Sequence, residues 1–478
     1  MDTITYKYPA PSGVIPTPEG NALVLSSFAE DRDTDEEQLF LGRLLHPLAT
    51  ARCLTTLAAV VHSRFTLSPE TIAAIHDPII SAGNGNIRFE GFSGCAGVYA
   101  RVDLLPGALD GVFTGGGTTN VDFNSPMLAA LGGVRQKDTV LLSVGQKEVA
   151  FGFDGGTVVE RKVPLPQRWL KGLTSVQHYL AGAEPLADLN RLQAARLFQR
   201  VPRAKTKSDF YLERRGRDIA FSPARSAAAV AIGGVERLRL LEPLIPHADR
   251  VRVFAHPSGS STTWQLYFGP VCFSCSLSRE PYRGYSGEGA GLDALLGELP
   301  AWLPDAAARC DAPGLANRLF SPAELADGMA DELARGRPGL AADEGAMKRP
   351  DAETAATLAE CLAAMGLLGY DLDARAYFYR KLPYKAERVL SLNPRLKNAL
   401  RLVEKGQVEL LERTDRKTSC HVQGSGVWHT VVLEGEGARC TCAWMGKYGG
   451  SRGPCKHILA VKKWLSLEDG RAPGTPLQ

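Results

Sequence analysis

Four side chains of the kind that bind metals stand in two close pairs near the C-terminal end of this sequence. Cys440 and Cys442 form a C-x-C pair, and twelve residues later Cys455 and His457 form a C-x-H pair. Three thiolates and one imidazole complete the tetrahedral shell of Zn²⁺, and four protein ligands leave no open position for water or substrate. The spacing therefore predicts one structural zinc ion that stabilises the surrounding fold and performs no catalysis.

The residues around these pairs predict how the site is built. Alternating apolar residues predict two strands, over 408–424 and 427–442. A proline and then an apolar run predict a helix that begins at the second pair, where the helix N-terminus favours the thiolate of Cys455. We expect a ββα unit over residues 408–466 and a flexible tail over 467–478.

This order of two strands, C-x-C, loop, C-x-H and helix resembles the SWIM zinc finger. The resemblance covers residues 408–466 and includes the run KHILAV at 456–461. Other phrases, such as RFEGFSGCAGVYARVDLLPGALDG, GTTNVDFN and LNPRLKNALRLVEKG, resemble a bacterial family of SWIM zinc finger proteins of about this length. Genes of that family often lie beside genes for a MoxR-type AAA ATPase and a von Willebrand A domain protein. The resemblance implies a zinc-bearing bacterial cytosolic protein, an adaptor in such an ATPase system, and no residue roles beyond the four ligands.

Hydrophobic periodicity divides the rest of the chain. Residues 1–30 are rich in proline and lack a helical period, so we expect an extended N-terminal arm or a loosely packed strand. Residues 31–203 begin with leucines at helical spacing and continue with alternating strands, which predicts an α+β domain. A basic connector at 200–209 ends it, and residues 204–297 predict a second, β-rich α+β domain.

The region 298–407 predicts a helical linker with a winged-helix-like part. Alanine, glycine, proline and acids dominate up to about residue 345, and a good helical pattern then covers 351–367. An aromatic and basic segment, GYDLDARAYFYRKLP, follows that helix. The expected fold class is multidomain α+β: two domains of helices and antiparallel sheet, this linker, and a C-terminal ββα zinc finger.

The N-terminal sequence and the composition favour a cytoplasmic protein. Asp2 stands where a signal peptide has its basic region, and no apolar run follows before Pro9. No stretch approaches the roughly 20 apolar residues that span a bilayer. Ten cysteines among 478 residues are too few for a secreted disulfide framework.

The net charge of +3 conceals two opposite parts of the chain. Residues 374–465 hold 18 Lys and Arg against 7 Asp and Glu, and the remainder holds 37 against 45. A basic end with interleaved aromatic residues is typical of nucleic-acid contact. A purely protein-binding scaffold, in which the basic end docks on an acidic surface, remains open. In either case the expected contacts are Lys447, Arg452, Lys456, Lys462 and Lys463.

A cysteine-dependent enzyme is the least favoured alternative. Cys272 and Cys275 form a C-x-x-C pair in a segment that reads as a strand, so their thiols should face opposite sides, and a nucleophilic Cys95 would need a histidine within reach. We therefore expect no catalytic residues. His421 and His429 precede the metal pairs and are interpreted as strand residues, with a supporting or alternate ligand role left open.

Overall fold

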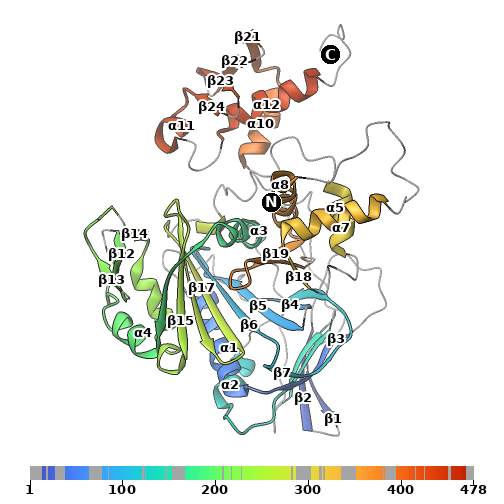
Figure 1. Ribbon diagram of the computed structural model, residues 1–478, viewed down its shortest axis with the longest axis vertical. Helices are drawn as coiled ribbons and strands as arrows, with labels where there is room; N and C mark the ends of the chain where they lie inside the picture. Colours follow the sequence, from blue (N-terminus) through green and yellow to red (C-terminus); the bar gives the residue numbers. More distant parts are fainter. Residues whose placement is uncertain are drawn as a thin grey trace. The chain divides into compact units, whose positions relative to one another are not determined.

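The chain forms two compact units, and each is built around its own core. One unit comprises residues 1–287 and 304–384, and the other comprises 288–303 and 385–478. The computed structural model (Figure 1) describes the following residues: 13–17, 20–26, 38–63, 78–83, 85–120, 123, 125–145, 148–152, 167–206, 209–216, 218–227, 229–280, 284–286, 303–311, 315, 318–334, 351–380, 382, 394–414, 416–424, 426–435, 437–449 and 454–469.

An eight-stranded antiparallel sheet forms the centre of the first unit, with strand order β11-β15-β16-β17-β6-β5-β4-β8. Its strands are β4 Ile79–Gly83, β5 Asn86–Phe92, β6 Val98–Leu104, β8 Gly117–Asn120, β11 Glu184–Asn190, β15 Arg250–Ala255, β16 Ser261–Phe268 and β17 Val271–Ser278. Two meanders, β4-β5-β6 and β15-β16-β17, meet where β6 pairs with β17. The expected boundary between 31–203 and 204–297 is therefore wrong, because main-chain pairing joins both segments into one sheet.

A second sheet has six strands in the order β1-β2-β10-β9-β3-β7. These are β1 Gly13–Thr17, β2 Gly20–Ser26, β3 Gln38–Leu44, β7 Leu109–Phe113, β9 Leu141–Gly145 and β10 Glu148–Gly152. Strand β2 pairs with both β1 and β10. Of the two alternatives for residues 1–30, the described residues therefore follow the strand, since β1 and β2 belong to a sheet.

Helices and a smaller sheet pack around these strands. The helices are α1 Pro47–His62, α2 Ser125–Gly133, α3 Gln167–Ala181 and α4 Arg191–Phe198, with 3-10 turns η2 Val235–Leu241, η3 Ile245–His247 and η4 Gly284–Ser286. A three-stranded sheet contains β12 Phe210–Arg215, β13 Asp218–Ser222 and β14 Val230–Ile232, with β12 in the middle. The buried Trp264 of β16 contacts Phe198 and Phe221, so α4 and the small sheet share a core with the large sheet.

The predicted winged-helix-like region contains helices and a three-stranded sheet. Its elements are α5 Leu303–Asp311, β18 Leu319–Phe320, α7 Pro322–Ala334, α8 Ala352–Ala364, β19 Leu368–Asp371 and β20 Ala376–Tyr379, and β20 is the middle strand. Asp351 caps α8 by accepting a hydrogen bond from the Thr354 N–H at 2.8 Å. Helix α8 packs against α3, and β19 also contacts α3.

Buried ion pairs attach this region to the large sheet. Glu90 of β5 pairs with Arg380, and both side chains are fully buried. Arg101 of β6 donates to the Tyr370 carbonyl at 2.8 Å, and the Arg88 guanidinium lies 3.8 Å from the centre of the Phe378 ring. The region is therefore part of the first unit up to residue 384.

The described part of the second unit contains a four-stranded antiparallel sheet and the helices α10, α11 and α12 (Figure 1, orange to red). In chain order its elements are α10 Pro394–Glu404, β21 Val408–Arg413, β22 Lys417–Gln423, β23 Trp428–Glu434, β24 Gly437–Cys440, α11 Ala443–Tyr448 and α12 Lys456–Asp469. Each of the two predicted strands is a hairpin, and Gly435 adopts φ 55° at one of the turns. Helix α10 packs on α12, so the expected division between 298–407 and 408–466 separates residues that share one core.

The fold class is confirmed as mixed helix and antiparallel sheet. Helix α12 continues to Asp469, past the start of the predicted tail at 467, and residues 470–478 lie outside the described residues. Among the helices that the structure describes, none combines the length and apolarity needed to cross a membrane.

Candidate metal centre

The sheet and two helix starts place the four predicted ligands. Cys440 is the last residue of β24, Cys442 is the N-cap residue of α11, and Cys455 and His457 flank the first residue of α12. Thr441 donates its N–H to the Thr430 carbonyl at 3.1 Å, and its hydroxyl accepts from the Thr430 N–H at 3.0 Å. These bonds extend the β23–β24 ladder through the C-x-C pair and fix its backbone.

The four ligand atoms converge on one point. The three Sγ atoms and one imidazole nitrogen all lie within 4.8 Å of one another. Nδ1 of His457 is 3.8 Å from Sγ of Cys440 and 3.9 Å from Sγ of Cys455. Tetrahedral zinc bonds imply edges of about 3.5 to 3.8 Å between ligand atoms. The donor set and its spacing therefore fit Zn²⁺, and no other such cluster occurs among the described residues.

Hydrogen bonding prepares one buried thiol for metal binding. Cys442, Cys455 and His457 are buried and Cys440 is half-buried. A hydrogen bond from Cys440, and further ones from His457 and the Ile458 N–H, outweigh the opposing effect of burial and lower the pKa of Cys455. The same contact with Cys455, together with burial, raises the pKa of Cys440. Metal binding at this site should therefore release protons.

A second histidine lies against the ligand histidine. The rings of His429 and His457 have centroids 4.3 Å apart, and Nε2 of His457 is buried without a hydrogen-bond partner among the described residues. A side chain on Gly424 would come within 2.9 Å of His429 and 3.3 Å of His457. His421 instead contacts Trp428. Of the two histidines left open by the sequence, only His429 touches the ligand shell.

Four of the five predicted contact residues lie on helices. Lys447 of α11 and Lys462 and Lys463 of α12 are exposed, and Lys456 is half-buried. Arg452 lies outside the described residues. The sequence reasoning missed three exposed basic residues at or just after α10, namely Lys397, Arg401 and Lys405. Their spacing of four residues on one helical stripe was the available signal.

The candidate cysteines of the enzyme alternative are buried in the first unit. Cys272 pairs with Asp103 and Cys275 with Ala100 in the β17–β6 register, so their side chains point to opposite faces. Burial raises the pKa of both thiols, which disfavours the thiolate that a nucleophile needs. Cys95 is buried beside the Ser93 hydroxyl at 3.3 Å.

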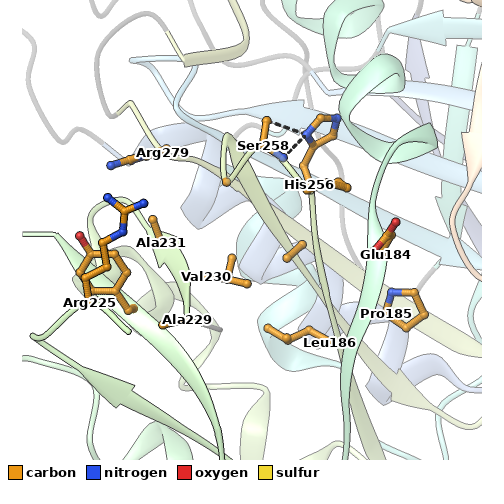
Figure 2. A pocket seen from close by; sticks show the side chains of 14 residues that line it. Glu184, Pro185, Leu186, Arg225, Ala229, Val230, Ala231, His256, Ser258 and Arg279 are labelled. Atoms are coloured by element: carbon orange, nitrogen blue, oxygen red, sulfur yellow. Dashed lines mark hydrogen bonds between the residues drawn. The ribbon is translucent and has the colours of Figure 1, made fainter. Parts of the chain in front are cut away.

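The first unit also contains a surface hollow of about 270 Å³ between the large and small sheets. Figure 2 shows Arg225 and Arg279 on one side of it and Glu184 on the other. Nδ1 of His256 lies 2.7 Å from the Ser258 hydroxyl. Burial lowers the pKa of His256. None of the described residues that line the hollow is a cysteine, so the hollow contains none of the candidate thiols.

The fold and the ligand cluster define an α+β protein with a zinc-finger-type metal centre. Residues 429–463 match the SWIM zinc finger family, and this match contains all four ligands. No curated protein matches the chain. The crystal structure of proliferating cellular nuclear antigen from Entamoeba histolytica aligns with a TM-score of 0.32 and 9% identity, covering 50% of this chain and 98% of that one. A likeness this low supports no conclusion about this chain.

Proposed function

We propose that the second unit is a zinc-stabilised interaction module whose helices contact nucleic acid. Cys440, Cys442, Cys455 and His457 would hold one Zn²⁺, which links β24 to α12 and supplies folding free energy without an open coordination position. The chain itself would act in binding only, since the described candidate thiols are buried.

The distribution of ion pairs supports the helical side as the contact surface. On the sheet, Lys417 pairs with Glu412 at 3.0 Å and Arg439 with Glu434 at 3.1 Å. On the helices, Lys462 and Lys463 are exposed and form no ion pair within the described residues. Uncompensated cations on one side of a small domain attract phosphates and release counterions.

A salt series of binding to a DNA duplex and to single-stranded DNA tests this proposal. Each phosphate contact adds about 0.9 to the slope of log K against log salt for duplex DNA. Replacing Lys462 and Lys463 with Ala should lower that slope by nearly two. Replacing the paired Lys417 and Arg439 removes the same charge and should change the slope little. No binding at low salt would refute nucleic-acid contact.

A protein partner is the second candidate for the same surface. The remainder of the chain outside 374–465 is acidic, so basic helices that dock on acidic protein surfaces are compatible with the charge distribution. The resemblance to the bacterial family suggests a role as a cytoplasmic adaptor for a MoxR-type AAA ATPase or a von Willebrand A protein. Co-purification with either partner, lost when Lys447, Lys462 and Lys463 are replaced by Glu, would favour this candidate.

Metal content tests the zinc site directly. Purified chain should carry about one zinc, and Cys442→Ala or His457→Ala should lose it. Cys420 is a matched control, because its thiol is fully buried in the same core and is not among the clustered ligands. Cys420→Ala should keep the zinc. Full zinc occupancy in the Cys442 and His457 variants would contradict the assignment.

A further inference from the structure

Helix α10 carries a buried arginine beside the metal centre. Arg395 is only 5% exposed, although arginine is almost never fully buried without specific partners. Its Nη1 donates a hydrogen bond of 2.6 Å to the Pro454 carbonyl. Its guanidinium carbon also lies 5.4 Å from the centre of the Trp444 ring, within cation–π range.

These two contacts lie beside both ligand pairs, the C-x-C pair and the C-x-H pair. Pro454 directly precedes Cys455, and Trp444 lies two residues after Cys442. The two cysteines are otherwise connected by the twelve residues that separate the ligand pairs, and α11 is part of these twelve. Arg395 therefore bridges the start of α12 and the start of α11 without using the metal.

The packing of α10 fixes the arginine in place. Residues 395, 399 and 402 are the buried positions of α10, which puts them on one face of the helix. Ala399 and Leu402 belong to the same hydrophobic core as Cys442 and Cys455. The guanidinium is thus presented from a rigid helix that shares its core with the ligands.

We propose that Arg395 is a positioning residue for the metal. It holds the Pro454 carbonyl and the Trp444 ring so that Cys455 and Cys442 stand near ligand distance before the metal binds. A partner that orients ligands in this way commonly contributes 10- to 100-fold in metal affinity. The inference rests on the proposed zinc site, but it assigns a role to a residue outside the matched range 429–463.

Competition with a chromophoric chelator on the full-length chain measures the effect. Arg395→Met keeps the length of the side chain and removes the donor and the charge, so the dissociation constant for Zn²⁺ should rise at least about tenfold. Arg401→Met is the matched control, because Arg401 lies exposed on the same helix. Its dissociation constant should stay within about twofold of wild type. Arg395→Lys retains a cationic donor and should recover part of the affinity.

Two further readouts separate positioning from general packing. With saturating Co²⁺, Arg395→Met should show the wild-type absorption of three thiolates and one imidazole, since the ligands are unchanged. Loss of apparent stability should appear mainly in the metal-loaded chain and little in the metal-free chain, because a positioning residue changes the linkage between metal and folding. Equal losses in both forms would overturn the proposal.

A second variant keeps the test decisive if Arg395→Met does not fold. Trp444→Leu removes the ring that the guanidinium covers, and its effect on zinc affinity should be non-additive with that of Arg395→Lys. Zinc affinity within twofold of wild type in folded Arg395→Met, or strict additivity of the other pair, would refute the role of Arg395. Absence of zinc from the wild-type chain would instead refute the metal site itself.

Discussion

At the scale of single residues, the pair of Glu90 and Arg380 should be among the most sensitive positions of the first unit. Both side chains are fully buried, and Glu90 also accepts a hydrogen bond from the Tyr99 hydroxyl. Glu90→Gln leaves Arg380 buried without its counter-ion, which typically costs about 3 to 5 kcal/mol. Urea unfolding of the first unit should show this loss, whereas Asp110→Asn, in an exposed pair with Arg43, should cost less than about 1 kcal/mol.

The same pair gives the first unit a defined acid sensitivity. Burial raises the pKa of Glu90, but attraction to Arg380 and Arg101 and the hydrogen bonds outweigh burial and leave that pKa below its usual value of 4.5. The stability from this carboxylate is therefore present above about pH 4.5 and is lost as pH falls through the lowered pKa. The free energy of unfolding, measured from pH 6 to pH 3, should fall more steeply in wild type than in Glu90→Gln. Parallel curves would contradict the linkage.

The cluster of four candidate ligands was predictable from the sequence, and the burial of Arg395 beside it was not. Cys440 and His457 are 17 positions apart, and each ligand pair is a local pattern of residue types that only a few environments explain. Arg395 reaches the site only because α10 packs on α12. Its hydrogen-bond partner, Pro454, lies 59 positions later in the chain. A single arginine in a basic helix carries no local sign of burial.

At the scale of elements, α10 should contribute to the stability of the second unit. Leu402 is 8% exposed and packs in the core that contains the ligand cysteines. Leu402→Ala should therefore destabilise the second unit by about 2 to 4 kcal/mol. Thermal unfolding of the second unit measures this loss, and Lys397→Ala, at an exposed position of the same helix, is the control. An unchanged transition in Leu402→Ala would show that α10 is not part of this core.

The pairing of β6 with β17 explains why the predicted boundary between 31–203 and 204–297 was wrong. Alternation identified β5, β6 and β17 as strands, but nothing local specifies that β6 pairs with β17, because that pairing joins residues about 170 positions apart. The sequence predicts each hairpin of the second unit as a single strand, because only a few residues separate β21 from β22 and β23 from β24. Helix α8 shows a different limit. Its pattern predicted a helix correctly, but its packing on α3 depends on tertiary contacts.

At the scale of the whole molecule, two separate cores should respond differently to metal removal. The ligands and the core around them all belong to residues 385–478, whereas the large sheet belongs to the other unit. Metal binding stabilises only the part that forms the site, since the ligands are brought together by folding of that part. Chelation should therefore loosen the second unit selectively.

Amide hydrogen exchange of the full chain checks this expectation. Peptides from β22, β23 and α12 should lose protection when a chelator removes the metal, and peptides from β5, β6 and β17 should exchange as before. Cys442→Ala without chelator should reproduce the same pattern, which excludes a direct effect of the chelator. Equal loss of protection in the strands of the large sheet would mean that the metal supports both cores. Selective loss would establish that the metal stabilises the second unit and leaves the core of the large sheet unchanged.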